Sequence, residues 1–397
     1  MIAEADKSGN CRLLGYASVR SKGLRNSRVI NIERTVESIC AAVMRSQQMA
    51  GVNVDKTIVG IAGSHICSIN SRGVISIAGT SDGLEVPSMI EESDVERVIE
   101  AAKSAKFAQD SQIIHSIPRE FKVDDIKRIH SPVGLTGQRL EVSLHLISSS
   151  LSEMNNLTRC VELSGLSQAQ FVLESIASAQ SVLTEDEKDR GVILMDIGGG
   201  TTDVAVLQNG AVSCTAEIEF GGEKVTDDIE MLFNIPWQEA ERIKVQYGSV
   251  LTLQTSTNPI RVNRTNEATA RYILPIDLNR VIQARMEEIF EMIVQVIQPG
   301  QNEAYYSGVV ITGGSSQFEG LSNLAEQKFY KPARVGFPMG MRDIDARVKN
   351  PIFATVSGLI RWGANSIHTS DSHMLSRPRK DAVNFNSFKR LINWLSN

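Results

Sequence analysis

The sequence of 397 residues has few cysteines and few aromatic residues, and it lacks any long apolar run. No stretch approaches the roughly 20 apolar residues that a membrane-spanning helix needs, and no signal peptide is recognisable, so we expect a cytosolic protein. The net charge is −5 without a domain-wide basic excess, which argues against nucleic-acid binding. The scattered cysteines show no Cys-x-x-Cys pair or ligand-spaced histidine, so neither a metal site nor a disulfide framework is predicted. They are Cys11, Cys40, Cys67, Cys160 and Cys214.

The most informative stretch lies in the middle of the chain, where residues 192–203 read VILMDIGGGTTD. The apolar run predicts a buried strand, and three consecutive glycines let a ligand approach the backbone without meeting a Cβ atom. Amide groups in such a loop are donors for phosphate oxygens, as are the hydroxyls of Thr201 and Thr202. Asp196 and Asp203 are suited to orient the water ligands of a Mg²⁺ ion.

The chain after these glycines does not open a helix, as a dinucleotide or Walker-type loop would. A second strand is predicted at 204–207, Asn209-Gly210 is a strong hairpin signal, and a third strand follows at 211–218. A phosphate loop between antiparallel strands is the arrangement of the actin, Hsp70 and hexokinase superfamily. The pattern favours nucleotide binding, and a purely structural turn is the alternative.

The two halves of the chain show the same order of elements. In the second half the hairpin leads to helices and to a strand at 309–312 that ends at Gly313-Gly314. In the first half a hairpin within residues 1–19 leads to an amphipathic helix at 32–49 and a strand at 58–61. We therefore predict a duplicated α/β fold. The first half has no counterpart of the strand and glycine loop at 192–203. We expect a preceding segment to supply them, with a nucleotide-free form as the alternative; as written, the chain should bind ATP poorly.

The end of the chain differs in composition from the rest. Residues 366–382 lose periodicity and predict a linker, whereas 383–397 predict an amphipathic helix. A terminal helix docked on its own domain is one interpretation. The other is an interfacial membrane helix, because aromatic and aliphatic residues share one face and basic residues lie upstream. The residues of the apolar face are Phe385, Phe388, Leu391, Ile392, Trp394 and Leu395.

Five segments together resemble FtsA, an actin-like family of bacterial cell-division proteins. They are SVLTEDEKDRG (181–191), GVILMDIGGGTTDVAVLQNG (191–210), GVVITGGSSQFEGL (308–321), SPVGLTGQRLEVSLHLI (131–147) and FNSFKRLINWL (385–395). The resemblance runs over the whole chain, and the insert at 64–141 sits where FtsA carries subdomain 1C. It implies subdomain 1A at 1–63 and 142–190, 2A at 191–226 and 298–365, and 2B at 227–297. The implied fold is an actin-like, ribonuclease-H-type duplication around a nucleotide cleft, with the C-terminal amphipathic helix.

The resemblance implies an ATP-binding adaptor, at most a weak ATPase, that polymerises on the cytoplasmic face of the inner membrane at the division site. It would tether the FtsZ ring to an anionic membrane surface and recruit later division proteins. ATP with Mg²⁺ is the implied cofactor. In subdomain 2B, Arg280, Arg285 and Glu288 would present a helix surface to the acidic C-terminal peptide of FtsZ. A solvated helix face is the alternative for these three residues.

The resemblance also assigns the nucleotide site. Gly221 and Gly222 would lie beside the nucleotide, and Glu241 with Lys244 would contact the ribose and adenine, unless they form only an i,i+3 ion pair. Glu174 would orient the attacking water, with helix capping as the alternative. Asp196, Gly198, Gly199, Gly200, Thr201, Thr202 and Asp203 would form the phosphate loop, and Gly313, Gly314 and Ser315 would close over the adenine side.

Three other functions compete with this interpretation. A sugar or acid kinase of the same superfamily needs a polar substrate pocket that no residue pattern demands, and it has no use for an amphipathic tail. An Hsp70-like chaperone needs a substrate domain after residue 365, where too little chain remains. A pilus-assembly relative of FtsA has the same insert but generally lacks the tail, so the tail favours the division protein.

Overall fold

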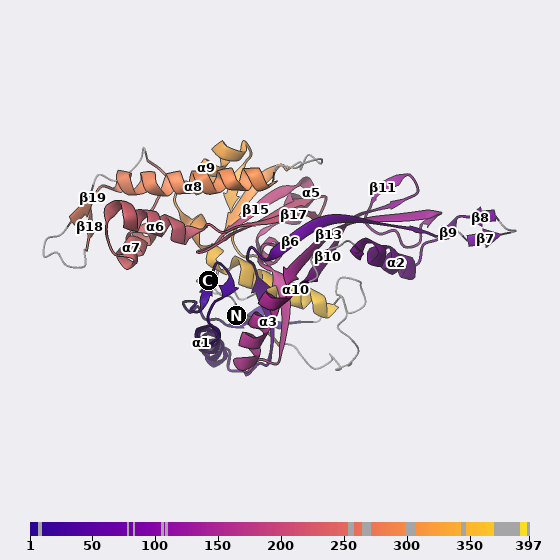
Figure 1. Ribbon diagram of the computed structural model, residues 1–397, viewed down its shortest axis with the longest axis horizontal. Helices are drawn as coiled ribbons and strands as arrows, with labels where there is room; N and C mark the ends of the chain where they lie inside the picture. The colour runs from indigo at the N-terminus through magenta and orange to yellow at the C-terminus, as the bar shows by residue number, and fades with distance from the viewer. Residues whose placement is uncertain are drawn as a thin grey trace.

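The computed structural model describes residues 1–397 except 7–9, 78, 82–83, 105–106, 108–109, 253–257, 264–270, 298–305, 343–346, 369–389 and 395–397. Its core is two β-sheets with helices on their faces, and an inserted sheet projects to one side (Figure 1). Along the described part of the chain, no helix combines the length and apolarity needed to cross a membrane.

The second-half sheet is built as the sequence predicts. Its order is β17-β16-β15-β20-β21, and the β16–β17 hairpin turns at Asn209-Gly210. The central strand β15 is buried along its whole length, because α8 and α9 pack on one face of the sheet and α4 on the other. The bounds are β15 Val192–Ile197, β16 Thr202–Gln208, β17 Ala211–Ile218, β20 Gly308–Thr312 and β21 Ala333–Val335.

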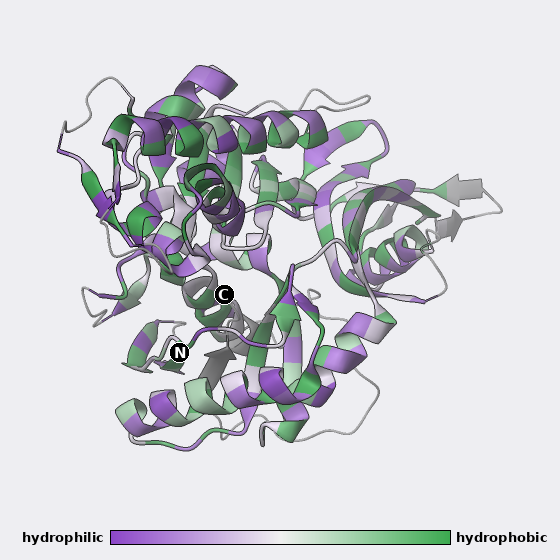
Figure 2. Ribbon diagram, turned by 60° about the vertical axis from the view of Figure 1, so that its left-hand side comes forward, coloured by the Kyte–Doolittle hydropathy of each residue, from purple (hydrophilic) through white to green (hydrophobic). Residues whose placement is uncertain are grey.

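Helices on the outer face of this sheet form the second-half lobe. The longest, α8, shows alternating hydrophobic and hydrophilic bands along the top of the view in Figure 2, because only one side of it faces the core. The elements are α6 Gly222–Phe233, α7 Trp237–Tyr247, β18 Ile260–Val262, β19 Arg271–Ile273, α8 Pro275–Ile297, η1 Gly314–Gln317, α9 Leu321–Phe329 and η2 Pro351–Phe353.

The first-half sheet has the order β14-β5-β23-β1-β2-β22 and repeats the arrangement of the second. Here β23 runs parallel to β5 and antiparallel to β1, as β15 does to β20 and β16. Helices α1 and α3 cover one face and α10 the other. The bounds are β1 Ile2–Ala5, β2 Cys11–Gly15, α1 Ile32–Ala50, β5 Lys56–Ile61, α3 Leu151–Leu163, β14 Gln168–Leu173, β22 Met341–Arg342 and β23 Arg390–Trp394.

The strand β23 corrects the prediction of a C-terminal helix at 383–397. Residues 390–394, which include Leu391, Ile392 and Trp394, are a strand hydrogen-bonded between β1 and β5. Leu391, Ile392 and Trp394 fit an apolar helix stripe, but the same residues are also compatible with a central strand of a sheet that has helices on both faces. The place also offers two strand edges that would otherwise lack partners. Phe385, Phe388 and Leu395 lie outside the described residues.

The insert forms a four-stranded sheet, β11-β10-β13-β6, with α2 on one face. Its other face meets β17 of the second-half sheet. Ser68 Oγ donates to the Thr215 carbonyl at 3.0 Å, and Asn70 Nδ2 donates to the Ser213 carbonyl at 3.2 Å. The elements are β6 Ile66–Ser76, β7 Gly79–Ser81, β8 Leu84–Val86, β9 Ser88–Met89, α2 Glu92–Lys103, β10 Ser111–Val123, β11 Ile126–Ile129, β12 Thr136–Gly137 and β13 Arg139–Ser150.

Two crossing helices join the halves. Helix α4 (Glu174–Val182) packs against both sheets, and α10 (Ala354–His368) crosses it. At the crossing, a Cβ atom on Gly358 would lie only 1.7 Å from the carbonyl oxygen of Ala177, so this close approach requires glycine. The short helix α5 (Glu185–Arg190) then leads into β15.

Candidate functional site

The loop of residues 198–201, which we call the glycine loop, connects β15 to β16 and is held by backbone hydrogen bonds. The amide of Gly198 donates to the carbonyl of Thr201 at 2.9 Å. The amides of Gly222 and Glu223, at the start of α6, donate to the carbonyls of Gly198 and Gly199 at 2.9 and 2.8 Å. The start of a helix therefore fixes the loop from behind.

The glycines of this region divide into two kinds. A Cβ atom on Gly221 would lie 2.6 Å from the Gly199 carbonyl, and one on Gly313, where φ is +85°, would lie 2.4 Å from an Asp196 carboxyl oxygen, so close packing requires both glycines. A Cβ atom on Gly199 or Gly200 would meet no atom nearer than 3.6 or 3.9 Å. Both distances are ordinary van der Waals contacts, so packing within the chain does not require glycine at these two positions, whereas a phosphate-binding backbone would.

Three carboxylates form a row across the second-half sheet. Asp196 on β15 lies opposite Asp203 on β16, and Asp203 lies opposite Glu217 on β17. Burial and the neighbouring Glu217 and Glu174 raise the pKa of Asp203. Burial raises the pKa of Glu217 to about 7.

Helices α4 and α10 connect this row to the junction of the halves. The carboxyl of Asp196 accepts hydrogen bonds from Ser178 Oγ on α4 at 2.5 Å and from Thr355 Oγ1 on α10 at 2.9 Å. Glu174 begins α4, and Gly60 on β5 leaves room for its carboxyl. Burial and the charges of Asp196 and Glu217 raise the pKa of Glu174 to about 8. The predicted Glu174 therefore does lie with the loop aspartates.

Sequence reasoning missed Glu217. A regular hairpin turning at Asn209-Gly210 would place residue 216 opposite Asp203, but a bulge near Leu207 shifts the register by one residue. Glu217 therefore joins the carboxylate row, and its Oε2 accepts a hydrogen bond from the Gly63 amide of the first half. Within the described residues, no group of three or more side chains is placed to hold a metal ion directly.

The predicted adenine side adjoins the same loop. Ser315 Oγ donates to the Gly198 carbonyl at 3.2 Å. Lys244 Nζ lies 2.6 Å from Glu241 and donates to the Gly222 carbonyl at 2.9 Å, and the Lys244 side chain is only 9% exposed. Glu241 and Lys244 thus form the i,i+3 ion pair, in which the Glu241 side chain is 34% exposed and the buried Lys244 also supports the start of α6.

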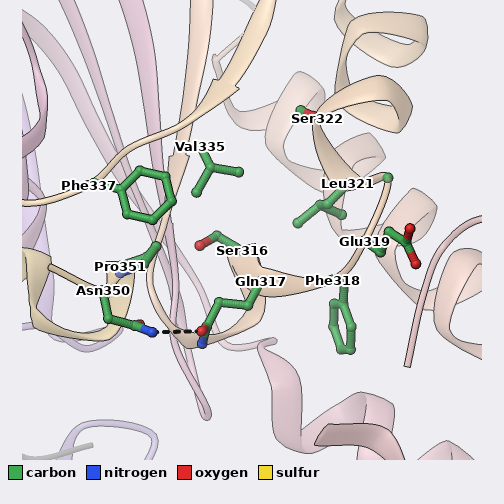
Figure 3. Close-up of a pocket in the computed structure, with 11 residues that line it drawn as sticks. Ser316, Gln317, Phe318, Glu319, Leu321, Ser322, Val335, Phe337, Asn350 and Pro351 are labelled. Atoms are coloured by element: carbon green, nitrogen blue, oxygen red, sulfur yellow. Dashed lines mark hydrogen bonds between the residues drawn. The ribbon is translucent and has the colours of Figure 1, made fainter. Parts of the chain in front are cut away.

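A cavity of about 420 Å³ lies beside η1 (Figure 3). Val335, Phe337 and Leu321 form its apolar wall, and Gln317 accepts a hydrogen bond from Asn350 at 2.9 Å on its border. Ser315 and the glycine loop are not among its lining residues. The cavity therefore lies beside η1 and does not include the glycine loop.

The predicted partner residues do not form one open surface. Arg285 binds Asp228 bidentately at 2.6 and 2.8 Å and also contacts Glu288, so its side chain is only 19% exposed. Arg280 is 66% exposed and reaches Asp277 at 3.6 Å. Of the two predicted arginines, Arg280 therefore has the more exposed side chain.

Comparisons with known proteins identify the family. The model for "Cell division protein FtsA" matches residues 193–358, and the model for the SHS2 domain inserted in FtsA matches 63–148. Cell division protein FtsA of Pseudomonas aeruginosa is 36% identical over 91% of this chain and 86% of its own length. Cell division protein FtsA of Escherichia coli K12 is 30% identical over 100% of this chain and 94% of its own length. The chain belongs to the FtsA family.

The FtsA family membership confirms the resemblance found in the sequence, and the actin-like duplicated fold is confirmed as well. A solved structure titled "PilM-PilN type IV pilus biogenesis complex" covers 91% of this chain and 94% of its own at a TM-score of 0.64 and 14% identity. At that identity the likeness concerns the fold alone. The match to the SHS2 domain spans residues 63–148, whereas the sequence predicts an insert at 64–141. The last strand of the inserted sheet, β13, continues to Ser150, beyond the predicted end.

The carboxylate row predicts a pH-dependent stability in metal-free buffer. The folded chain holds the protons of Glu217 and Glu174 more tightly than the unfolded chain does, so the free energy of unfolding should fall as pH rises from about 5 to about 8. Glu217→Gln should remove on the order of 3 kcal/mol of that decrease. Urea unfolding at several pH values measures it. Glu37→Gln, on the exposed face of α1, is the control, and an unchanged pH slope in Glu217→Gln would contradict the assignment.

Proposed function

We propose that this FtsA-family chain is an ATP-binding adaptor that tethers the FtsZ ring to the cytoplasmic face of the inner membrane, polymerises there and recruits later division proteins. The observation that carries the nucleotide part is the glycine loop, which α6 fixes from behind and in which Gly199 and Gly200 have room for a Cβ atom. Ordinary packing does not need glycine at these two positions, whereas backbone contact with a phosphate does.

The carboxylates fit a hydrated magnesium ion that accompanies the phosphates. Burial raises the pKa of Glu174, Asp196, Asp203 and Glu217, and the charges of neighbouring carboxylates in this group raise the pKa of Glu174 and Asp203 further. A Mg²⁺ ion bound there would stabilise their ionised forms and neutralise phosphate charge. Glu174, kept ionised by the magnesium ion, would accept a proton from a water molecule, so weak ATP hydrolysis is compatible with the proposal.

Membrane tethering requires that the C-terminal segment change its place. A segment hydrogen-bonded as β23 cannot at the same time lie as a helix in the lipid interface. The proposal therefore includes release of residues 390–394 from the first-half sheet when the apolar residues enter the membrane. One short helix binds weakly, so stable attachment depends on several tails in one polymer.

The second-half lobe offers features for the acidic FtsZ peptide. Exposed apolar side chains occur on α6, with Met231 78% exposed, and on β19, with Tyr272 61% exposed. Arg271 Nη1 joins the two elements by donating to the Phe233 carbonyl at 2.8 Å. Arg280 on α8 adds an accessible guanidinium for a carboxylate.

Replacing Gly199 by Val tests the nucleotide site. The side chain meets little of the protein itself, so the fold should remain intact, but it fills the space in front of the loop. ATP affinity, measured by titration with a fluorescent ATP analogue, should fall at least about 100-fold. Circular dichroism checks folding. Unchanged affinity in a folded variant would reject the loop as the phosphate site.

Membrane binding is tested with a pair of charge changes on the tail. The double variant Phe388→Glu with Trp394→Glu should lose most co-sedimentation with anionic liposomes, because the charges would enter the apolar layer. Asn386→Glu with Asn393→Glu adds the same charge on the polar side of the predicted helix, and it should retain most binding. Equal behaviour of the two variants would rule out the amphipathic anchor.

FtsZ recognition is tested at Arg280 rather than Arg285. Arg285→Glu would set an acid against Asp228 and disturb the lobe, whereas Arg280 is mainly exposed. Arg280→Glu should weaken binding of the FtsZ C-terminal peptide about tenfold by fluorescence anisotropy. Arg45→Glu on α1 is the matched control. If Arg280→Glu leaves the dissociation constant unaltered, the peptide does not bind at Arg280.

A further inference from the structure

A small hairpin of the first half reaches the glycine loop of the second half. Strands β3 (Leu24–Arg25) and β4 (Arg28–Val29) flank a two-residue turn at Asn26 and Ser27. Backbone and side-chain atoms of Asn26 lie 3.9–4.0 Å from the Cβ position of Gly200, and Asn26 Nδ2 donates to Glu219 at 3.5 Å. The tip of the hairpin therefore borders the space that Gly200 leaves open.

The turn at the tip has an unusual backbone. Both Asn26 (φ +46°) and Ser27 (φ +60°) are left-handed, a conformation that costs free energy for residues other than glycine. Hairpins of this type usually carry Gly at the second position. Strain of this kind persists where the surroundings hold it and is concentrated at functional sites.

The base of the hairpin is held firmly. The carbonyl of Gly23 accepts hydrogen bonds from the amides of Ile30 and Asn31 at 2.8 and 3.0 Å, next to the start of α1. Just before it, the Arg20 guanidinium lies 5.4 Å from the centre of the Trp237 ring on α7. The segment from Arg20 to Val29 thus contacts the second half both at the glycine loop and at α7.

Arg28 brings positive charge to the carboxylates. Ser27, which precedes Arg28, has its Cβ atom 3.6 Å from the Cβ position of Gly63, whose amide donates to Glu217. Burial is the main cause of the raised pKa of Glu217 and of the lowered pKa of His65, and the charge of Arg28 acts to lower both. Its ion pair is with Glu153 on α3, at 3.4 Å, and the Arg28 side chain remains 47% exposed. Nearby, both ring nitrogens of His65 and Oε1 of Glu217 are buried without a hydrogen-bond partner in the described part of the chain.

We propose that the β3–β4 hairpin is the first-half contact for the phosphate chain, with Arg28 binding the terminal phosphate across the cleft from the glycine loop. The inference rests on the proposed ATP binding. A guanidinium suits this task, because a phosphate beside four carboxylates needs a cation and Arg binds phosphate oxygens bidentately. Arg28 therefore distinguishes a nucleoside triphosphate from a diphosphate.

The test compares ATP and ADP affinities in variants of the full chain, titrated with fluorescent nucleotide analogues in the presence of Mg²⁺. Arg28→Gln should weaken ATP at least about tenfold and ADP less than about twofold, because only ATP carries the terminal phosphate. Arg45→Gln on α1 removes the same charge far from the cleft and should change neither. Thermal unfolding verifies that each variant folds.

Glu153→Gln separates phosphate binding from mere anchoring of the hairpin. If Arg28 binds phosphate, loss of the competing carboxylate leaves ATP affinity unchanged or stronger. If Arg28 only fixes the hairpin to α3, Glu153→Gln weakens ATP as Arg28→Gln does, and the proposal is overturned.

Two further results would also overturn it. If Arg28→Gln binds ATP normally while Gly199→Val does not, Arg28 does not bind the terminal phosphate, and the glycine loop remains supported as the phosphate site. If the unmodified chain binds neither nucleotide, both the hairpin contact and the proposed nucleotide site fall together.

Discussion

The close crossing of α4 and α10 at Gly358 is the constraint on which the rest of the molecule depends. It brings the two helices near enough for Ser178 and Thr355 to donate to the same Asp196 carboxyl. The first carboxylate of the cleft is therefore fixed by one hydroxyl from each helix of the junction. Any change in the angle between the halves would alter these two hydrogen bonds, so cleft chemistry and domain arrangement are coupled through them.

The second-half site could be predicted from the sequence because its signals are local. A buried run, three glycines and Asn209-Gly210 determine a strand, a loop and a hairpin without reference to the rest of the chain. Gly221 and Gly313 also have local turn signals. The close contacts of Gly221 with the glycine loop and of Gly313 with the end of β15 depend on the fold and have no local signal.

The missed features depend on contacts between distant residues. Glu217 enters the carboxylate row through a bulge of one residue, which no alternation pattern in β17 reveals. The turn at Asn26 and Ser27 could not be recognised as part of the candidate site from the sequence, because its neighbour Gly200 lies far along the chain. The apolar residues of 390–394 fit a helix stripe and a two-sided buried strand equally well, and the free place between β1 and β5 favours the strand.

The contact between the insert and β17 has a consequence for how copies of the chain can associate. The carbonyls of Ser213 and Thr215 lie on the outer edge of the second-half sheet, where a strand from another molecule would normally add. Side chains of Asn70 and Ser68 already occupy these acceptors. The insert thus covers that edge, so copies of this chain cannot associate by extending this sheet from one molecule to the next.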